Sequence, residues 1–207
     1  MNDLSHIKEW FALPDNTKIN IFKQIEDKTG IKVWAIEKDW WVTHTLAIIF
    51  SMTYADKLIF KGGTSLSKAW NLIERFSEDI DMVLDRNFLG FAGDLNKSQI
   101  HKLRYASYEF LTTKFTSELE AKFRESGFND VMVKYQNVVN HDQDPLIIEI
   151  YYPKLTEPEE YLRPGVLVEI GSRSLKEPFT PRNIQTIVAE MFVGKAFADN
   201  PVSIPTV

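Results

Sequence analysis

A pair of glycines, followed at short range by two aspartates on a strand, constrains this sequence more than any other feature. Gly62 and Gly63 come after the apolar residues 58–60 and before a segment with apolar positions at helical spacing. Glycine adopts positive φ and lets another group approach the backbone, and the first N–H groups of a helix are unpaired and attract anions. The segment therefore predicts a strand, a turn and a helix start that binds phosphate, or else an ordinary glycine turn capped by Thr64 or Ser65.

The acidic half of this feature has the alternation of a strand. Residues 77–84 place Asp79 and Asp81 on one face and apolar side chains on the other. Two carboxylates on one face repel each other unless a cation lies between them, and Mg²⁺ commonly binds one or two carboxylates together with substrate phosphates. A solvated strand face is the alternative. An EF-hand is excluded, because Leu84 stands where that loop needs glycine and Gly90 where it needs glutamate.

A third carboxylate is predicted from an apolar strand further along the chain. Glu169 stands between Val168 and Ile170, where a lone carboxylate is costly unless it is paired or bound to a metal. Glu149 occupies a similar apolar stretch and is the competing candidate. Periodicity does not rank the two residues.

Four segments together resemble the AbiEii-type nucleotidyltransferases, which are the toxins of type IV toxin–antitoxin systems within the DNA polymerase β-like superfamily. They are EKDWWVT at 37–43, GGTSLSK at 62–68, FSEDID at 76–81 and VLVEIGSRS at 166–174. The resemblance covers most of residues 35–207. It favours Glu169 over Glu149, because a Gly-Ser-Arg stretch follows the acidic strand of the family.

The resemblance implies an α+β fold, with a nucleotidyltransferase-like mixed sheet flanked by helices and an N-terminal helical segment. It implies transfer of a nucleoside monophosphate from an NTP to an acceptor hydroxyl on tRNA or protein, and neutralisation by a cognate antitoxin. The implied catalytic residues and ligands for Mg²⁺ or Mn²⁺ are Asp79, Asp81 and Glu169. The implied nucleotide contacts are Lys61, Gly62, Gly63, Thr64, Ser65, Lys68 and Arg173.

Other interpretations of the same residues stay open. Residues 37–39 are either a solvated first helical turn or a support for the nucleotide site, and Arg173 is either a substrate contact or a surface ion pair. An Asp-x-Asp glycosyltransferase would also hold a metal through carboxylates, although it does not explain the Gly-Gly-Thr-Ser helix start. A catalytically silent binding module of the same fold is a third interpretation.

Length and composition set further limits. A chain of 207 residues, 44% of them hydrophobic, can bury a core, and we expect a single domain with N-terminal helices over 1–56 and an α/β core over 57–207. The net charge of −5 favours a small nucleotide over a large nucleic-acid surface, and the absence of cysteine excludes disulfides and thiolate sites. The longest apolar run, 46–52, is far below the roughly 20 residues that span a bilayer, so we expect a cytoplasmic protein that makes no membrane contact. Relatives continue into a helical region with a Glu-Lys motif, and we expect that region to be absent from this chain.

Periodicity and turn signals also predict the elements. Helices are expected over 17–28, 35–54, 64–73 and 97–125. Strands are expected to end at residue 60 and to span 77–84, 131–139, 145–152, 165–174 and 185–192, with a turn-rich break over 176–183.

Overall fold

Local signals set the ends of several helices. Helix α2, Asp15–Thr29, begins after Pro14 and ends at Gly30, which adopts a left-handed φ of 76° and donates its N–H to the Glu26 carbonyl. Helix α5, Lys97–Phe110, begins with a capping box in which Asn96 and Gln99 each accept from the other's backbone N–H. These short-range contacts account for helix ends that do not depend on the rest of the fold.

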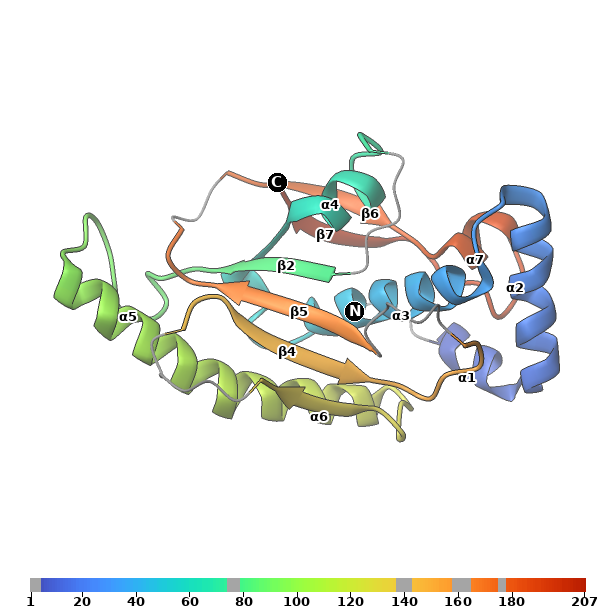
Figure 1. Cartoon of the computed structure of the whole chain (residues 1–207), viewed down its shortest axis with the longest axis horizontal. Helices are drawn as coiled ribbons and strands as arrows, with labels where there is room; N and C mark the ends of the chain where they lie inside the picture. The colour runs from blue at the N-terminus through green and yellow to red at the C-terminus, as the bar shows by residue number, and fades with distance from the viewer. Residues whose placement is uncertain (1–4, 74–78, 137–142, 158–164, 175–177) are drawn as a thin grey trace.

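The computed structural model describes residues 5–73, 79–136, 143–157, 165–174 and 178–207 (Figure 1). Further helices are α1 Ser5–Ala12, α3 Val33–Ile49, α4 Gly62–Lys68, α6 Thr116–Glu125 and α7 Ile187–Met191. A 3₁₀ turn spans Ala55–Lys57, and a π-helical segment, Leu111–Phe115, joins α5 to α6. The strands are β1 Leu58–Lys61, β2 Asp79–Leu84, β3 Met132–Tyr135, β4 Leu146–Tyr151, β5 Val166–Gly171, β6 Thr180–Ile184 and β7 Val202–Thr206.

Within the described ranges, seven strands form one mixed sheet in the order β3-β4-β5-β2-β1-β7-β6. Strands β2 and β5 pair in parallel, as do β1 and β7, and the other neighbours are antiparallel. The two acidic strands, β2 and β5, are therefore direct neighbours near the middle of the sheet. The α+β fold expected from the sequence is confirmed.

Helix α3 is the buried centre of the molecule. Every residue from Ala35 to Ile49 is buried, charged side chains included, and such an all-round buried helix must be covered on every side. It packs against the sheet and α6, with α2 and α7 at one end (Figure 1). Trp40, Phe60 and Phe115 are among the largest fully buried side chains, and burying each contributes about 2–3 kcal/mol. The core thus lies between the sheet and its helices.

The predicted elements correspond to α2, α3, the continuous α5–π–α6 helix and strands β1 to β5. The helix expected over 64–73 is shorter and earlier, since α4 begins at Gly62 and ends at Lys68, and Asn71 has a φ of 51°, which a helix does not allow. The strand expected over 185–192 is wrong. That stretch holds helix α7, capped by Thr186, and strand β6 lies in the predicted break instead.

Some elements were not expected, and some expected residues lie outside the described ranges. Helix α1 and strand β7 were not expected from the pattern of the sequence. Residues 76–78 of the acidic motif lie outside the described residues, as do residues 137–139 of the third expected strand.

Candidate active site

The pairing of β2 with β5 brings two carboxylates together. Asp81 and Glu169 are direct partners in the parallel register, so their side chains leave the same face of the sheet on neighbouring strands. Asp79, two residues earlier on β2, also belongs to this face and lies opposite Leu167. Two acids that are far apart in the sequence therefore become neighbours because a long crossover returns β5 alongside β2.

A cavity of about 580 Å³ opens beside this carboxylate pair. Its charged lining residues are Lys61, Asp81, Arg86, Asp94, Asp144, Glu169 and Arg173. Of the three predicted metal ligands, Asp81 and Glu169 line the cavity, whereas Asp79 is not among its lining residues. Of the predicted nucleotide contacts, the structure brings Lys61 and Arg173 to the same cavity.

Glu149, the competing third carboxylate, faces a different environment. It lies opposite Leu167 on β4 and accepts hydrogen bonds from Gln136, at 2.8 Å, and from the Tyr151 hydroxyl. It is not among the residues that line the cavity. The register therefore places Glu169, and not Glu149, next to Asp81.

The glycine turn touches the acidic strand directly. Gly62 has a φ of +78°, and a Cβ built on it would stand 2.1 Å from Oδ2 of Asp81. No side chain fits there, so glycine is required both by the backbone conformation and by the carboxylate. Gly63 follows as the second residue of α4. This contact fixes the helix start against the metal-ligand candidate.

The hydroxyls of the next two residues are engaged within the fold. Thr64 donates to the Asp79 carbonyl at 2.5 Å, and Ser65 donates to the Val207 carbonyl at 3.0 Å while also contacting the Thr206 hydroxyl. Both side chains are fully buried. The contribution of these residues to a bound phosphate would come from backbone N–H groups.

Burial and neighbouring charges act on Asp81 in opposite directions. Burial raises the pKa of its carboxyl above the ordinary value, the charge of Lys61 lowers it, and the charge of Asp79 raises it again. Lys61 is the antiparallel partner of Asp81 on β1, which explains why its charge acts on this carboxyl. A raised pKa shows that this carboxylate is held where negative charge is unfavourable, as expected for a cation ligand.

A family model described as nucleotidyl transferase AbiEii toxin, type IV TA system, matches residues 46–207, more than three quarters of the chain. The chain belongs to the AbiEii family. A search of the curated proteins found no match. The mixed-sheet α+β fold is consistent with the nucleotidyltransferase-like domain of an AbiEii toxin.

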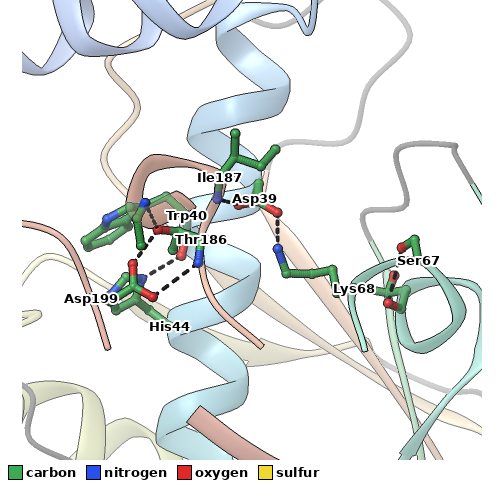
Figure 2. A network of polar contacts seen from close by, with 10 residues as sticks. Asp39, Trp40, His44, Ser67, Lys68, Thr186, Ile187 and Asp199 are labelled. Atoms are coloured by element: carbon green, nitrogen blue, oxygen red, sulfur yellow. Dashed lines mark hydrogen bonds and ion pairs between the residues drawn. The ribbon is translucent and has the colours of Figure 1, made fainter. Parts of the chain in front are cut away.

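The AbiEii match begins within α3, so the segment 37–43, which the sequence linked to the family, precedes the matched range. Side chains of this segment nevertheless form hydrogen bonds and an ion pair with neighbouring elements. Asp39 forms an ion pair with Lys68 of α4 and accepts from the Ile187 N–H at 2.8 Å, as Figure 2 shows. Glu37 accepts from the backbone N–H groups of Leu155 and Thr156.

Lys68 of the AbiEii chain, predicted as a nucleotide contact, therefore points toward α3. Its side chain is 12% exposed and that of Asp39 is 7% exposed, so the pair is largely buried. The same network continues through Thr186, whose N–H and hydroxyl both donate to Asp199 (Figure 2). Lys68 thus fixes α4 relative to α3 and α7.

The AbiEii site has a suitable donor set for a hard cation. Among the described residues, no group of three or more histidine, aspartate or glutamate side chains is positioned to hold a metal ion. Two adjacent carboxylates are enough for Mg²⁺ when substrate phosphates complete its coordination, and Asp81 and Glu169 supply them. The oxygen ligands of Asp81 and Glu169 beside a cavity therefore fit Mg²⁺ or Mn²⁺.

Sequence reasoning missed three charged residues of the cavity, namely Arg86, Asp94 and Asp144. None belongs to a motif. Asp144 precedes β4 and accepts from the Ser172 N–H at 2.8 Å. This bond connects the start of β4 to the end of β5. The one available signal was position, because Arg86 follows the acidic strand by two residues. No helix within the described ranges is long and apolar enough to cross a membrane.

Proposed function

We propose that this AbiEii chain transfers a nucleoside monophosphate from an NTP to an acceptor hydroxyl and acts as a toxin neutralised by a cognate antitoxin. The observation that carries the proposal is the parallel pairing of Asp81 with Glu169 in the wall of a cavity, with Gly62 packed against Asp81. Phosphoryl transfer depends on positioning the phosphates and on neutralising their charge. A phosphate-binding turn would do the first, and two carboxylates that hold a metal ion would do the second.

The residues have separable roles in this reaction. Asp81 and Glu169, with Asp79 as the third candidate ligand, would hold Mg²⁺ or Mn²⁺, and the bound metal would neutralise phosphate charge and make the acceptor hydroxyl more acidic. Lys61 and Arg173 line the cavity and would neutralise the triphosphate. The backbone N–H groups at Gly62 and Gly63 would bind its oxygens.

The chemical step exchanges a phosphoanhydride bond for a phosphodiester bond. The acceptor oxygen attacks the α-phosphorus of the NTP, a new bond forms between them, and the bond from the α-phosphorus to the leaving pyrophosphate breaks. Glu169 accepts the proton that the acceptor hydroxyl loses. The acceptor is a hydroxyl of tRNA or of a protein, and we place the reaction in the cytoplasm, where nucleoside triphosphates are available.

Lys68 and Ser65 have supporting roles in this proposal. Lys68 is paired with Asp39, and Ser65 donates to the Val207 carbonyl, so both fix the position of α4. They orient the N-terminus of the helix toward the triphosphate and do not contact it through their side chains.

The test uses NTPs labelled at either the α- or the γ-phosphorus, incubated with the protein, total RNA, cell-extract proteins and Mg²⁺. We expect label from the α position in RNA or protein and none from the γ position, because pyrophosphate leaves. Asp81→Asn and EDTA should each abolish the signal. Transfer of the γ label, transfer from a UDP-sugar alone, or no labelled product with any of the four NTPs would contradict the proposal.

A further inference from the structure

Arg86 is a buried cation in the wall of the cavity. It lies two residues beyond the end of β2, is 8% exposed, and lines the cavity that Asp81 and Glu169 also line. Its Nη2 donates to the Gly93 carbonyl at 2.5 Å. Its Nε is buried and has no hydrogen-bond partner among the described residues. None of the ion pairs between described residues involves Arg86. No motif of the sequence accounts for this residue.

The loop around Arg86 holds it in place. The Leu89 and Phe91 N–H groups donate to the Arg86 carbonyl at 3.1 and 3.0 Å, so residues 87–93 wrap around it. The bond from the guanidinium to Gly93 closes this loop. The side chain is therefore fixed before any ligand arrives, which lowers the entropy lost on binding.

Stabilising this loop uses only part of the hydrogen-bonding capacity of the Arg86 guanidinium. An arginine carries five N–H donors and a permanent charge, and a single bond to a neutral carbonyl uses one donor and gives the charge no direct ion-pair partner among the described residues. Burial of an unpaired charge is strongly unfavourable, so native structures pair such groups with an opposite charge. An anion that enters the cavity would supply that charge.

The chemistry of the cavity indicates which anion this is. The planar guanidinium matches the geometry of phosphate oxygens and binds them through paired hydrogen bonds. The acidic residues on the same wall would repel a simple carboxylate ligand, whereas a phosphate ester arrives together with the metal ion that the acidic pair would hold.

We infer that Arg86 binds a phosphate group of the substrate inside the cavity, as a substrate-positioning residue. The inference rests on the proposed nucleotidyl transfer, which supplies two sources of that phosphate. One is the triphosphate of the nucleotide and the other is a phosphodiester of a nucleic-acid acceptor.

The experiment measures binding of inorganic tripolyphosphate and of an RNA trinucleotide to the full chain by calorimetry, with and without Mg²⁺. Arg86→Gln and Arg86→Lys are compared with the wild type. Arg124→Gln is the matched control, because Arg124 is 62% exposed on α6, where it pairs with Glu120. Thermal unfolding of each variant checks that it is folded.

We expect Arg86→Gln to weaken binding of at least one ligand by about tenfold or more, Arg86→Lys to weaken it less, and Arg124→Gln to leave it within about twofold. Loss for tripolyphosphate identifies the triphosphate as the source, and loss for the trinucleotide identifies the phosphodiester. Equal affinities in the wild type and Arg86→Gln for both ligands overturn the inference, as does a wild type that binds neither.

Two further readouts keep the result interpretable. If both Arg86 variants unfold, the Nε–H signal of Arg86 in the NMR spectrum of the wild type should shift on titration with the ligand, and an unmoved signal overturns the inference. The labelled-NTP assay separates this inference from the proposed function. Transfer activity without any effect of Arg86→Gln on binding refutes only the role of Arg86, whereas Arg86-dependent phosphate binding without transfer refutes only the enzymatic activity.

Discussion

At the scale of single residues, the contact between Gly62 and Asp81 couples the glycine turn to the acidic strand. The Asp81 carboxylate occupies the space that any side chain at position 62 would need. The backbone there also has a left-handed φ of +78°. Glycine is thus required for two separate reasons, and a substitution can distinguish them.

We predict that Gly62→Ala lowers both stability and activity. The left-handed backbone alone disfavours alanine by about 1 kcal/mol, and displacement of Asp81 adds a further loss and moves the carboxylate away from Glu169. Gly194→Ala is the matched control, because Gly194 has a φ of +77° and open space around its Cα. Urea unfolding and the labelled-NTP assay should show a larger loss of stability for Gly62→Ala and loss of activity for that variant alone. Equal effects of the two substitutions would refute the steric role of Asp81.

The two candidate third carboxylates also differ at this scale. We predict that Glu169→Gln lowers kcat by roughly 100-fold or more, because it would remove both a proposed metal ligand and the proposed proton acceptor. Glu149→Gln should leave kcat within about threefold, since its bonds to Gln136 and Tyr151 lie outside the cavity. Initial rates of nucleotide transfer measure both, and a stronger effect of Glu149→Gln would reverse the assignment.

At the scale of elements, the ion pair of Asp39 with Lys68 holds three helices in one arrangement. Asp39 belongs to α3, Lys68 ends α4, and Ile187 begins α7. The charge of Lys68 also acts on Glu190 of α7. Burial raises the pKa of the Glu190 carboxyl, and Lys68 opposes that shift. The position of the candidate phosphate-binding turn therefore depends on Asp39, a residue of the preceding helix α3.

We predict a strong energetic coupling within this pair. Asp39→Asn should destabilise the protein by about 3 kcal/mol, because it leaves the Lys68 charge buried without its partner. The single variant Lys68→Met and the double variant Asp39→Asn/Lys68→Met complete the set. The loss of stability in the double variant should be smaller than the sum of the losses in the two single variants by at least about 1 kcal/mol, because both charges are removed. Urea unfolding of the four proteins completes the cycle, and additive losses would rule out the coupling.

Local signals account for the elements that the sequence predicted well. The Gly30 end of α2 and the Asn96 cap of α5 are encoded within a few residues. The stretch 185–192 was misread because its apolar residues fit a strand, whereas Thr186 accepts from the Ala189 N–H and is itself held by Asp199, 13 residues away. Strand β7 was missed because Pro205 suggests a turn, and its pairing with β1 is a long-range contact.

The residues of the candidate site also fall into those that local sequence patterns identify and those that depend on long-range contacts. The motifs identified Asp81, Glu169 and Gly62, because each stands in a characteristic local pattern. The engagement of Ser65 by Thr206 and of Lys68 by Asp39 depends on residues 141 and 29 positions away, and no local pattern carries that information. Arg86 was missed for the same reason, since its significance lies in a cavity that only the folded sheet creates.

At the scale of the whole molecule, a buried histidine pair links α1 to α3. Nδ1 of His44 donates to the Trp40 carbonyl at 2.7 Å, which leaves Nε2 to accept from Nε2–H of His6 at 2.8 Å. Burial lowers the pKa of His44 to about 4; the charge of Asp199 opposes this shift, and His6 and Lys68 add to it. The folded protein therefore holds His44 in its neutral form.

We predict that the contribution of His44 to stability falls as the pH is lowered from about 6.5 to 4. The unfolded chain protonates His44 near its ordinary pKa of about 6.5 and the folded chain only near 4, so protons bind preferentially to the unfolded state in this window. The contribution of His44 is fully present above pH 6.5 and decreases by on the order of 3 kcal/mol toward pH 4.

The free energy of unfolding, measured against pH in urea, tests this prediction. The stability difference between the wild type and His44→Asn should narrow as the pH falls through this window. His101→Asn, on the exposed side of α5, is measured in parallel as the control substitution. A constant difference between the wild type and His44→Asn would show that His44 does not titrate as proposed.

The parallel pairing of β2 with β5 also determines when the candidate site comes into existence. Asp81 is synthesised 88 residues before Glu169, and the two become neighbours only when β5 joins the sheet. Ribosomes add about 5–20 residues per second, so a nascent chain spends several seconds with half of its carboxylate pair. On the proposed assignment of Asp81 and Glu169, the partly made polypeptide therefore lacks a complete site during translation.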